Sequence, residues 1–319
     1  MLIGEVHLGA VRKNSHHFVA LVHSWTKRFF AALWLVAVLS TQGFAGTSLL
    51  PVKLDEYGRI TIPVTLEGGK QEQYFLLDTA ARRSLLLNKD SGLSAVRLYQ
   101  QGTIRHFSSH GLLRLPAAVI AGWKIGDRLV GNSLIGLYPD NASARGLVGN
   151  DDFVGHILHW APKQKRLGVY TNTLPISTAA WHNIGGKPNR HFSMMLKTEY
   201  QGEEITVLVA TGTSRTLLDN DTASRLSQGA KNRPIDKRPS AMSAIGLGFP
   251  SKSFRELILP DFKIGAWSLG DIKVLSARVD VREITGFMDA PVMILGADIL
   301  LKHEVAFDFR DYQLWVHMQ

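Results

Sequence analysis

The residues best suited to chemistry stand in two matching segments of the chain. Asp78-Thr79-Ala80 follows an apolar run at 74–77, and Ala210-Thr211-Gly212 follows an apolar run at 206–209. A carboxylate in such a loop can take a proton from water or donate one, which is the work of a general base or acid. The first segment therefore offers Asp78 as a candidate catalytic residue. The second segment has Ala210 at the matching position, where no carboxylate is available.

Two further segments recur in the same order, which predicts an internal duplication. Trp123-Lys124-Ile125-Gly126 matches Phe262-Lys263-Ile264-Gly265, and Gly146-Leu147-Val148-Gly149 matches Met293-Ile294-Leu295-Gly296. The two units are predicted to cover residues 46–173 and 190–319. Residues 174–189, which contain two prolines and a Gly-Gly pair, are predicted to be the linker between them.

Hydrophobic periodicity predicts that both units are all-β. Residues 59–66 alternate between apolar and polar types, 67–70 have turn composition, and 72–77 form the returning strand. A second hairpin is expected near the C-terminus, at 305–309 and 313–316. Residues 298–301 are expected to form one short helix, so that the class is all-β with little helix.

Together these motifs resemble a known family. An apolar strand ending in Asp-Thr-Gly, followed by an arginine and Leu-Leu and later by an apolar pair before glycine, resembles the aspartic peptidases. The nearest likeness is to the retropepsin-like group with secreted bacterial members, and it covers most of residues 55–319. The resemblance implies two tandem closed β-barrels related by a pseudo-two-fold axis.

The resemblance also implies a mechanism. One aspartate from each half would share a single proton, because two carboxylates about 3 Å apart cannot both ionise. One carboxylate would activate a water while the other protonates the carbonyl oxygen of a peptide. Thr79 and Thr211 would hydrogen-bond across the axis, and a flap hairpin would close over an extended peptide or protein segment.

The chain departs from the family pattern at two positions. Ala80 stands where the motif has glycine, and it adds a methyl where close backbone approach is expected. Ala210 stands where the motif has its second aspartate. A single chain therefore has one carboxylate, Asp78, and from the sequence alone Ala210→Asp would restore the pair.

Three interpretations follow from this departure. The chain is an aspartic endopeptidase if Asp78 finds a second carboxylate, for example Asp78 of a second copy in a homodimer. Alternatively, it is a catalytically inactive pseudo-peptidase that binds an extended peptide or a partner protein. In the third interpretation another group replaces the missing acid or the fold does something else. Asp219 and Asp221 are expected to lie too far from the loop to replace it.

Several other residues belong to the same pattern. The flap is expected at 101–111 in the first unit and at 246–250 in the second. Arg83 and Arg215 match between the units, either as an ion pair that braces a loop or as solvated charges. His156 and His303 occupy equivalent places, which favours a structural role over a ligand.

The N-terminus has the composition of a secretory signal. Lys27-Arg28 precedes the apolar run 29–39, and small residues follow up to Ala45. The run is too short for a comfortable membrane span of about 20 residues. Residues 1–45 are therefore predicted to be an N-terminal extension and signal peptide, and the mature protein is predicted to be periplasmic without a stable membrane span.

The composition of the chain and the motifs that it lacks exclude several functional classes of protein. The chain of 319 residues has no cysteine, which excludes disulfides, Cys-ligated zinc and a thiol nucleophile. The formal net charge is +9, but the basic residues are scattered, so we expect no nucleic-acid partner. Phosphate-loop, dinucleotide and H-E-x-x-H motifs are absent, so we expect neither a cofactor nor a bound metal.

Overall fold

The computed structural model describes most of the chain after the N-terminal extension. Strands dominate these residues and the helices are short, which confirms the all-β class. The predicted signal segment and the second flap candidate lie outside the described residues. None of the helices within the described part is long and apolar enough to cross a membrane. The described residues are 48–66, 72–86, 98–108, 111–138, 145–171, 180–226, 231–234, 255–279, 285–286 and 290–318.

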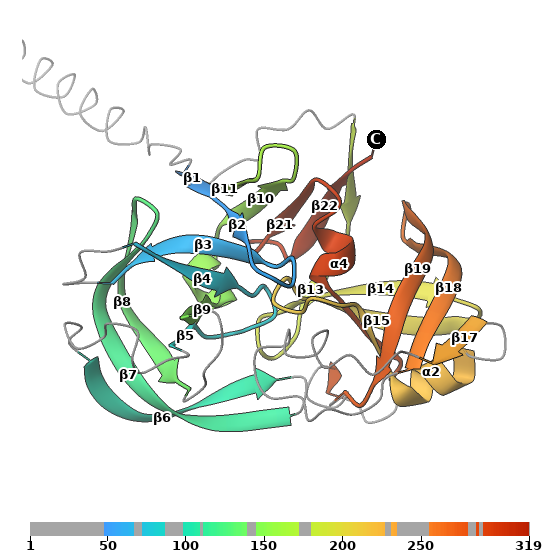
Figure 1. The fold of residues 1–319 in the computed structure, drawn as a ribbon, viewed down its shortest axis with the longest axis horizontal. Coiled ribbons are helices and arrows are strands. Elements are labelled where there is room, and N and C mark those ends of the chain that lie inside the picture. The colour runs from blue at the N-terminus through green and yellow to red at the C-terminus, as the bar shows by residue number, and fades with distance from the viewer. Residues whose placement is uncertain are drawn as a thin grey trace, which may run out of the picture. The chain divides into compact units, whose positions relative to one another are not determined.

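An eight-stranded sheet forms the first half of the chain (Figure 1). It closes on itself because β3 also pairs with β7, with Val64 opposite Ile125. Its interior is filled by large apolar side chains such as Phe75 and Trp123, each 1 % exposed. In sheet order the strands are β2 (Lys53–Leu54), β3 (Ile60–Thr65), β4 (Gln73–Leu77), β9 (Gly146–Val148), β5 (Leu85–Leu86), β8 (Arg128–Leu137), β7 (Gly111–Ile125) and β6 (Leu98–Ser108).

A second eight-stranded sheet forms the second half and remains half open. Two strands that are not neighbours in this sheet, β14 and β18, meet through a side chain, since the Thr198 hydroxyl donates a hydrogen bond of 2.6 Å to the Lys263 carbonyl. In sheet order the strands are β13 (Lys187–Pro188), β14 (Met194–Tyr200), β15 (Glu203–Val209), β20 (Val292–Leu295), β16 (Leu217–Asp219), β19 (Trp267–Ala277), β18 (Arg255–Ile264) and β17 (Lys231–Pro234).

The two sheets have the same strand order and the same strand directions. β4 runs parallel to β9, and β15 runs parallel to β20. β5 runs antiparallel to β9 and parallel to β8. In the same way β16 runs antiparallel to β20 and parallel to β19. In each half the loop after the run at 74–77 or 206–209 therefore leaves the sheet beside the strand that precedes Gly149 or Gly296.

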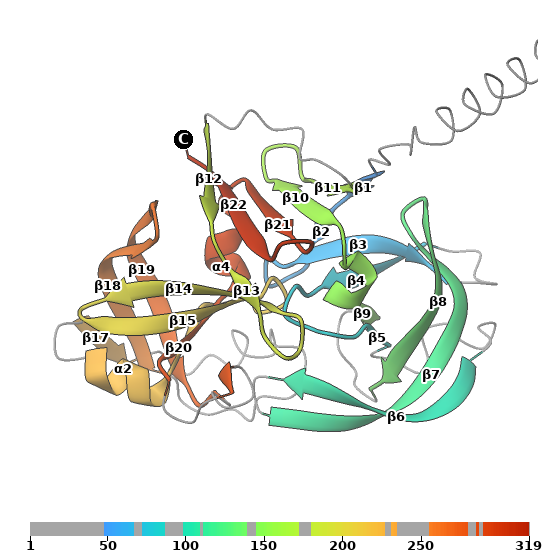
Figure 2. The ribbon, with the colours of Figure 1, turned by 180° about the vertical axis from the view of Figure 1, so that it is seen from behind.

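A third sheet joins strands from both ends of the chain. β10 pairs antiparallel with β21, with Leu158 opposite Phe307, and Figure 2 shows these strands side by side. The Trp160 indole, buried in this sheet, donates a hydrogen bond of 3.0 Å to the Leu301 carbonyl. In sheet order the six strands are β1 (Ser48–Pro51), β11 (Arg166–Tyr170), β10 (Ile157–Ala161), β21 (Val305–Asp308), β22 (Gln313–His317) and β12 (Trp181–Ile184).

Several local predictions are confirmed. The hairpins β3–β4 and β21–β22 lie where the periodicity places them, and the short helix α4 spans Ala297–Leu300. Within the described residues the other short helices are α2 (Asn220–Leu226) and a 3-10 turn at Asn150–Phe153. The described part of the predicted linker, 180–189, contains β12 and β13, which pair with β22 and β14. Buried Trp181 and Ile184 anchor β12.

The hydrogen bond from Thr198 gives a test of how the second sheet is held together. Thr198→Val keeps the shape of the side chain but leaves the Lys263 carbonyl without this donor, so we expect a loss of about 1–3 kcal/mol in the free energy of unfolding. Thr206→Val is the matched control, because the half-buried Thr206 hydroxyl in β15 makes no hydrogen bond to another described residue. Equal losses in the two variants, measured by denaturant unfolding, would contradict the closing role of Thr198.

Candidate active site

Two loops bring the predicted site residues together. Asp78 follows β4 and Ala210 follows β15, and each loop leads into the next short strand, β5 or β16. The Asp78 amide donates to the Val148 carbonyl and the Ala210 amide to the Leu295 carbonyl, each at 3.0 Å. Equivalent backbone bonds therefore hold Asp78 and Ala210 at equivalent places in the two sheets.

The two threonines exchange hydrogen bonds between these loops. The Thr79 hydroxyl donates to the Val209 carbonyl and accepts from the Thr211 amide, each at 3.1 Å. The Thr211 hydroxyl donates to the Leu77 carbonyl at 2.8 Å and accepts from the Thr79 amide at 3.1 Å. Both side chains are buried, so four backbone groups receive their partners from the opposite half of the chain.

Glycine in the later motif allows each loop to lie against its own sheet. A Cβ atom on Gly149 would lie 2.7 Å from the Arg83 carbonyl carbon, and one on Gly296 would lie 2.6 Å from that of Arg215. The Gly149 amide donates to the Ser84 hydroxyl at 2.8 Å, and the Gly296 amide donates to the Thr216 hydroxyl at 3.1 Å. The apolar-apolar-Gly pattern in the sequence reflects this packing.

Asp78 is half-buried and is held by backbone amides. Its Oδ1 accepts a hydrogen bond of 2.9 Å from the Ala80 amide. Burial raises the pKa of the Asp78 carboxyl above its ordinary value, although the amides of Ala80, Ala81 and Gly212 and the charge of Arg59 act in the opposite direction. The protonated form of Asp78 is thus favoured relative to an exposed aspartate.

Arg59 is a site residue that the sequence analysis did not identify. It is 3 % exposed, its Nη1 donates to the Gly212 carbonyl at 3.2 Å, and its Nη2 lies 2.7 Å from Asp55 Oδ2. On the other side of the site the Ser193 hydroxyl donates to the Ala80 carbonyl at 2.7 Å. The Arg59 guanidinium therefore supports the Gly212 loop, which faces Asp78. The neutral Ser193 hydroxyl supports the loop that carries Asp78.

Arg59 and Ser193 are delivered by two turns of the same kind. Asp55 Oδ1 accepts from the amide of Arg59 at 2.8 Å, and Asn189 Oδ1 accepts from the amide of Ser193 at 3.0 Å. Asp and Asn commonly fold the following backbone in this way. The shared spacing of Asp-x-x-x-Arg and Asn-x-x-x-Ser before a strand was the signal in the sequence that could have found them.

The surroundings of Ala210 are apolar, in contrast to those of Asp78. Ala210 is 1 % exposed and lies in a cluster with buried side chains such as Leu208 and Ile294. Ala80 packs against this cluster. One side of the site thus carries a carboxylate and a nearby guanidinium, and the other side carries two methyl groups.

The matched arginines form ion pairs close to these loops. Arg83 Nη1 lies 3.2 Å from Asp151 Oδ2, and Arg215 Nε lies 3.4 Å from Asp298 Oδ2. Burial raises the pKa values of the Asp151 and Asp298 carboxyls, and the charge of the adjacent arginine opposes this in each case. Both arginines thus connect the turn after the site loop to the helix after the glycine motif.

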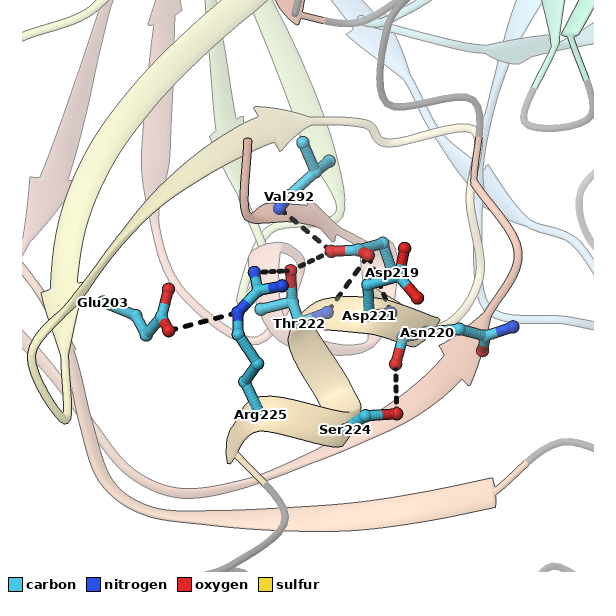
Figure 3. A network of polar contacts seen from close by, with 8 residues as sticks. All are labelled: Glu203, Asp219, Asn220, Asp221, Thr222, Ser224, Arg225 and Val292. Carbon is cyan, nitrogen blue, oxygen red and sulfur yellow. Dashed lines mark hydrogen bonds and ion pairs between the residues drawn. The ribbon is translucent and has the colours of Figure 1, made fainter. Parts of the chain in front are cut away.

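Asp219, considered as a replacement acid, has a structural role instead (Figure 3). It is 4 % exposed, and its Oδ1 accepts from the amides of Asp221 and Thr222 at 3.0 and 3.1 Å, which caps α2. Its Oδ2 accepts from the Thr222 hydroxyl and from the Val292 amide. These four donors occupy the carboxylate.

The residues predicted as the first flap belong to the β6–β7 hairpin. Its ladder continues to Ser108 opposite Gly111, and the residues between them lie outside the described part. His106 in β6 is buried, and burial, together with the charge of His191, lowers its pKa to about 4. His191 belongs to the turn that delivers the Ser193 hydroxyl to the Ala80 carbonyl.

Comparison of the chain with protein-family profiles and with curated proteins found no match. Within the described residues, no group of three or more His, Asp or Glu side chains could hold a metal ion. His303, one of the two matched histidines, packs edge-on against Trp267 with ring centroids 5.0 Å apart.

Removing one hydroxyl of the threonine exchange should uncouple the halves. Thr79→Val and Thr211→Val each leave one buried amide and one buried carbonyl without a partner, so we expect a loss of about 2–4 kcal/mol in the free energy of unfolding. Thr→Ser at either position keeps the hydroxyl and should lose about 1 kcal/mol. Denaturant unfolding measures both, and Ser variants as unstable as the Val variants would contradict the hydrogen-bonding role.

The raised pKa of Asp78 predicts a pH-dependent contribution to stability. The folded state holds the Asp78 proton to a higher pH than the unfolded chain does, so ionisation weakens folding as the pH rises above about 3.9, the ordinary pKa of aspartate. The amide side chain of the Asp78→Asn variant cannot ionise. The melting temperature of Asp78→Asn minus that of the wild type should therefore become more positive between about pH 3.5 and 7. Asp127→Asn, at an exposed turn, is the control for the lost charge, and a difference that falls with pH would contradict the prediction.

Proposed function

We propose that this chain is a retropepsin-like protein of the aspartic-peptidase type whose catalytic pair is reduced to one carboxylate, and that it binds an extended peptide or protein segment without cleaving it. The observation that carries the proposal is the position of Ala210. It occupies the place equivalent to Asp78 in a loop that is locked to the Asp78 loop by Thr79 and Thr211.

The shared architecture supports the family assignment. The two eight-stranded sheets have the same order and directions, and equivalent loops meet where the sequence resemblance places the two halves of an active site. Equivalent bonds from Arg59 to the Gly212 carbonyl and from Ser193 to the Ala80 carbonyl extend the likeness beyond the motifs. We therefore propose that the chain is a duplicated unit with a pseudo-two-fold axis between the loops.

The missing carboxylate removes half of the proposed chemistry. In peptide hydrolysis by a carboxyl pair, one carboxylate takes a proton from water as the oxygen attacks the carbonyl carbon, and the other carboxyl gives a proton to the carbonyl oxygen. The C–N bond then breaks as the amine nitrogen is protonated. Acid–base help of this kind is typically worth about 10²–10⁴ in rate. Asp78 alone cannot perform both transfers in one step.

The homodimer alternative is less well supported by the geometry. To place a second Asp78 opposite the first, another copy would have to displace the Ala210 loop. That displacement would break the exchange of hydrogen bonds by Thr79 and Thr211, all of which lie within one chain. A single chain already fills both sides of the site.

The β6–β7 hairpin is the element that we propose binds the ligand. An extended segment pairs with exposed strand edges through backbone hydrogen bonds, which accept many sequences. β6 is the edge strand of the first sheet, and the charge of His191, in the turn that delivers Ser193, acts on His106 in β6. A peptide between this hairpin and the loops would run past Asp78.

Incubation of the full chain with a peptide library from about pH 3 to 7 tests the proposal. We expect no cleavage products, and we expect bound peptides to slow hydrogen exchange in β6 and β7 but not in the distant control hairpin β21–β22. Asp78→Asn should leave this protection in place at acidic pH. Cleavage that disappears in Asp78→Asn would show an active peptidase, and its dependence on protein concentration would then test for a dimer. If the protein is folded and added peptides do not slow hydrogen exchange in β6 or β7, the binding proposal is wrong.

A further inference from the structure

The room around Asp78 depends on a residue of the other half. A Cβ atom built on Gly212 would lie 2.3 Å from Asp78 Cγ and 2.4 Å from Asp78 Oδ2. Real Cβ atoms do not come this close to other heavy atoms, and the amides of Ala80 and Gly212 hold the carboxylate where it is. An acid at 78 and a side chain at 212 therefore exclude each other.

The same relation should hold between residues 80 and 210. The Thr79 and Thr211 bonds, the bonds from Arg59 and Ser193, and the amide bonds of Asp78 and Ala210 all repeat with the two halves exchanged. Residue 80 is consequently placed toward residue 210 as residue 212 is placed toward residue 78. The observed packing agrees, since Ala80 lies against the apolar cluster that contains Ala210.

We infer that Ala80 and Ala210 form an interdependent pair across the two halves, in which the Ala80 methyl occupies the room that a carboxylate at position 210 would need. This rests on the proposed equivalence of the two loops. Each side of the site then has one of two combinations: an acid facing a glycine, as with Asp78 and Gly212, or an alanine facing an alanine, as with Ala210 and Ala80. A single Ala210→Asp replacement does not restore the catalytic pair, because it also needs glycine at 80.

The first test is a double-mutant cycle of Ala210→Asp, Ala80→Gly and the combined variant, followed by thermal unfolding of the full chain at about pH 4. At this pH two neighbouring carboxyls can share a proton. Ala210→Asp should lower the melting temperature by about 4–10 °C through overpacking. Ala80→Gly alone should lower it by about 1–4 °C. The combined variant should melt at least about 3 °C above Ala210→Asp.

A mirrored cycle on the Asp78 side serves as the matched control and decides the matter if Ala210→Asp does not fold. Gly212→Ala should melt well below the wild type, because its methyl meets the Asp78 carboxylate. Adding Asp78→Ala reproduces the alanine–alanine combination and should recover most of the loss.

The outcomes separate cleanly. The inference is wrong if Ala210→Asp is as stable as the wild type. It is also wrong if Ala210→Asp folds and the combined Ala80→Gly/Ala210→Asp variant is no more stable than it. If neither of those variants folds, additive losses in the mirrored cycle would overturn it and recovery would support it. All of these readings are unfolding temperatures. A failure to bind peptide would therefore count against the proposed function and leave the coupling of 80 with 210 to be decided separately.

Discussion

Two loops from distant parts of the chain are joined through two buried threonines, and the rest of the site is arranged around that contact. The Thr79 and Thr211 hydroxyls are the only side-chain partners that the structure shows, among the described residues, for four buried backbone groups of these loops. A buried amide or carbonyl without a partner costs about 1–3 kcal/mol. The halves are thus held at one separation, and each residue beside the threonines must fit the narrow space that this separation leaves.

Small residues gather at the site for two reasons, because each loop lies against its own sheet and because the two loops lie close to each other. Gly149 and Gly296 admit the turns at Arg83 and Arg215, and Gly212 admits the Asp78 carboxylate. Ala80 and Ala210 fill the remaining side with two methyl groups. Ala210 is 1 % exposed within an apolar cluster, so the side of the site without a carboxylate is buried among apolar side chains.

The resulting site is polar on one side and apolar on the other. Asp78 lies near the guanidinium of Arg59, which is itself paired with Asp55, so a partly buried carboxylate has a compensating charge nearby. At the position equivalent to Arg59 in the second half, the neutral Ser193 hydroxyl bonds the Ala80 carbonyl, and Ala80 packs against the apolar cluster of Ala210. This asymmetry supports our proposal that the site binds an extended segment and does not transfer protons between two carboxylates.

Local patterns in the sequence were enough to predict the all-β class, the hairpins β3–β4 and β21–β22, and the helix α4, because periodicity and turn chemistry act over a few residues. They missed β12 and β13, since the surrounding stretch 174–189 has the prolines and the Gly-Gly pair of a linker and these short segments pair with the distant β22 and with β14. The sequence also matched Asp78 with Ala210 and Thr79 with Thr211, and it showed that only the first of these loops carries a carboxylate. Only the tertiary structure decided that residue 78 faces residue 212, and that Arg59 and Ser193 support the opposite loops. Those contacts join residues more than a hundred positions apart, as the separation of 132 between Thr79 and Thr211 illustrates, and they depend on the distance between the two folded halves.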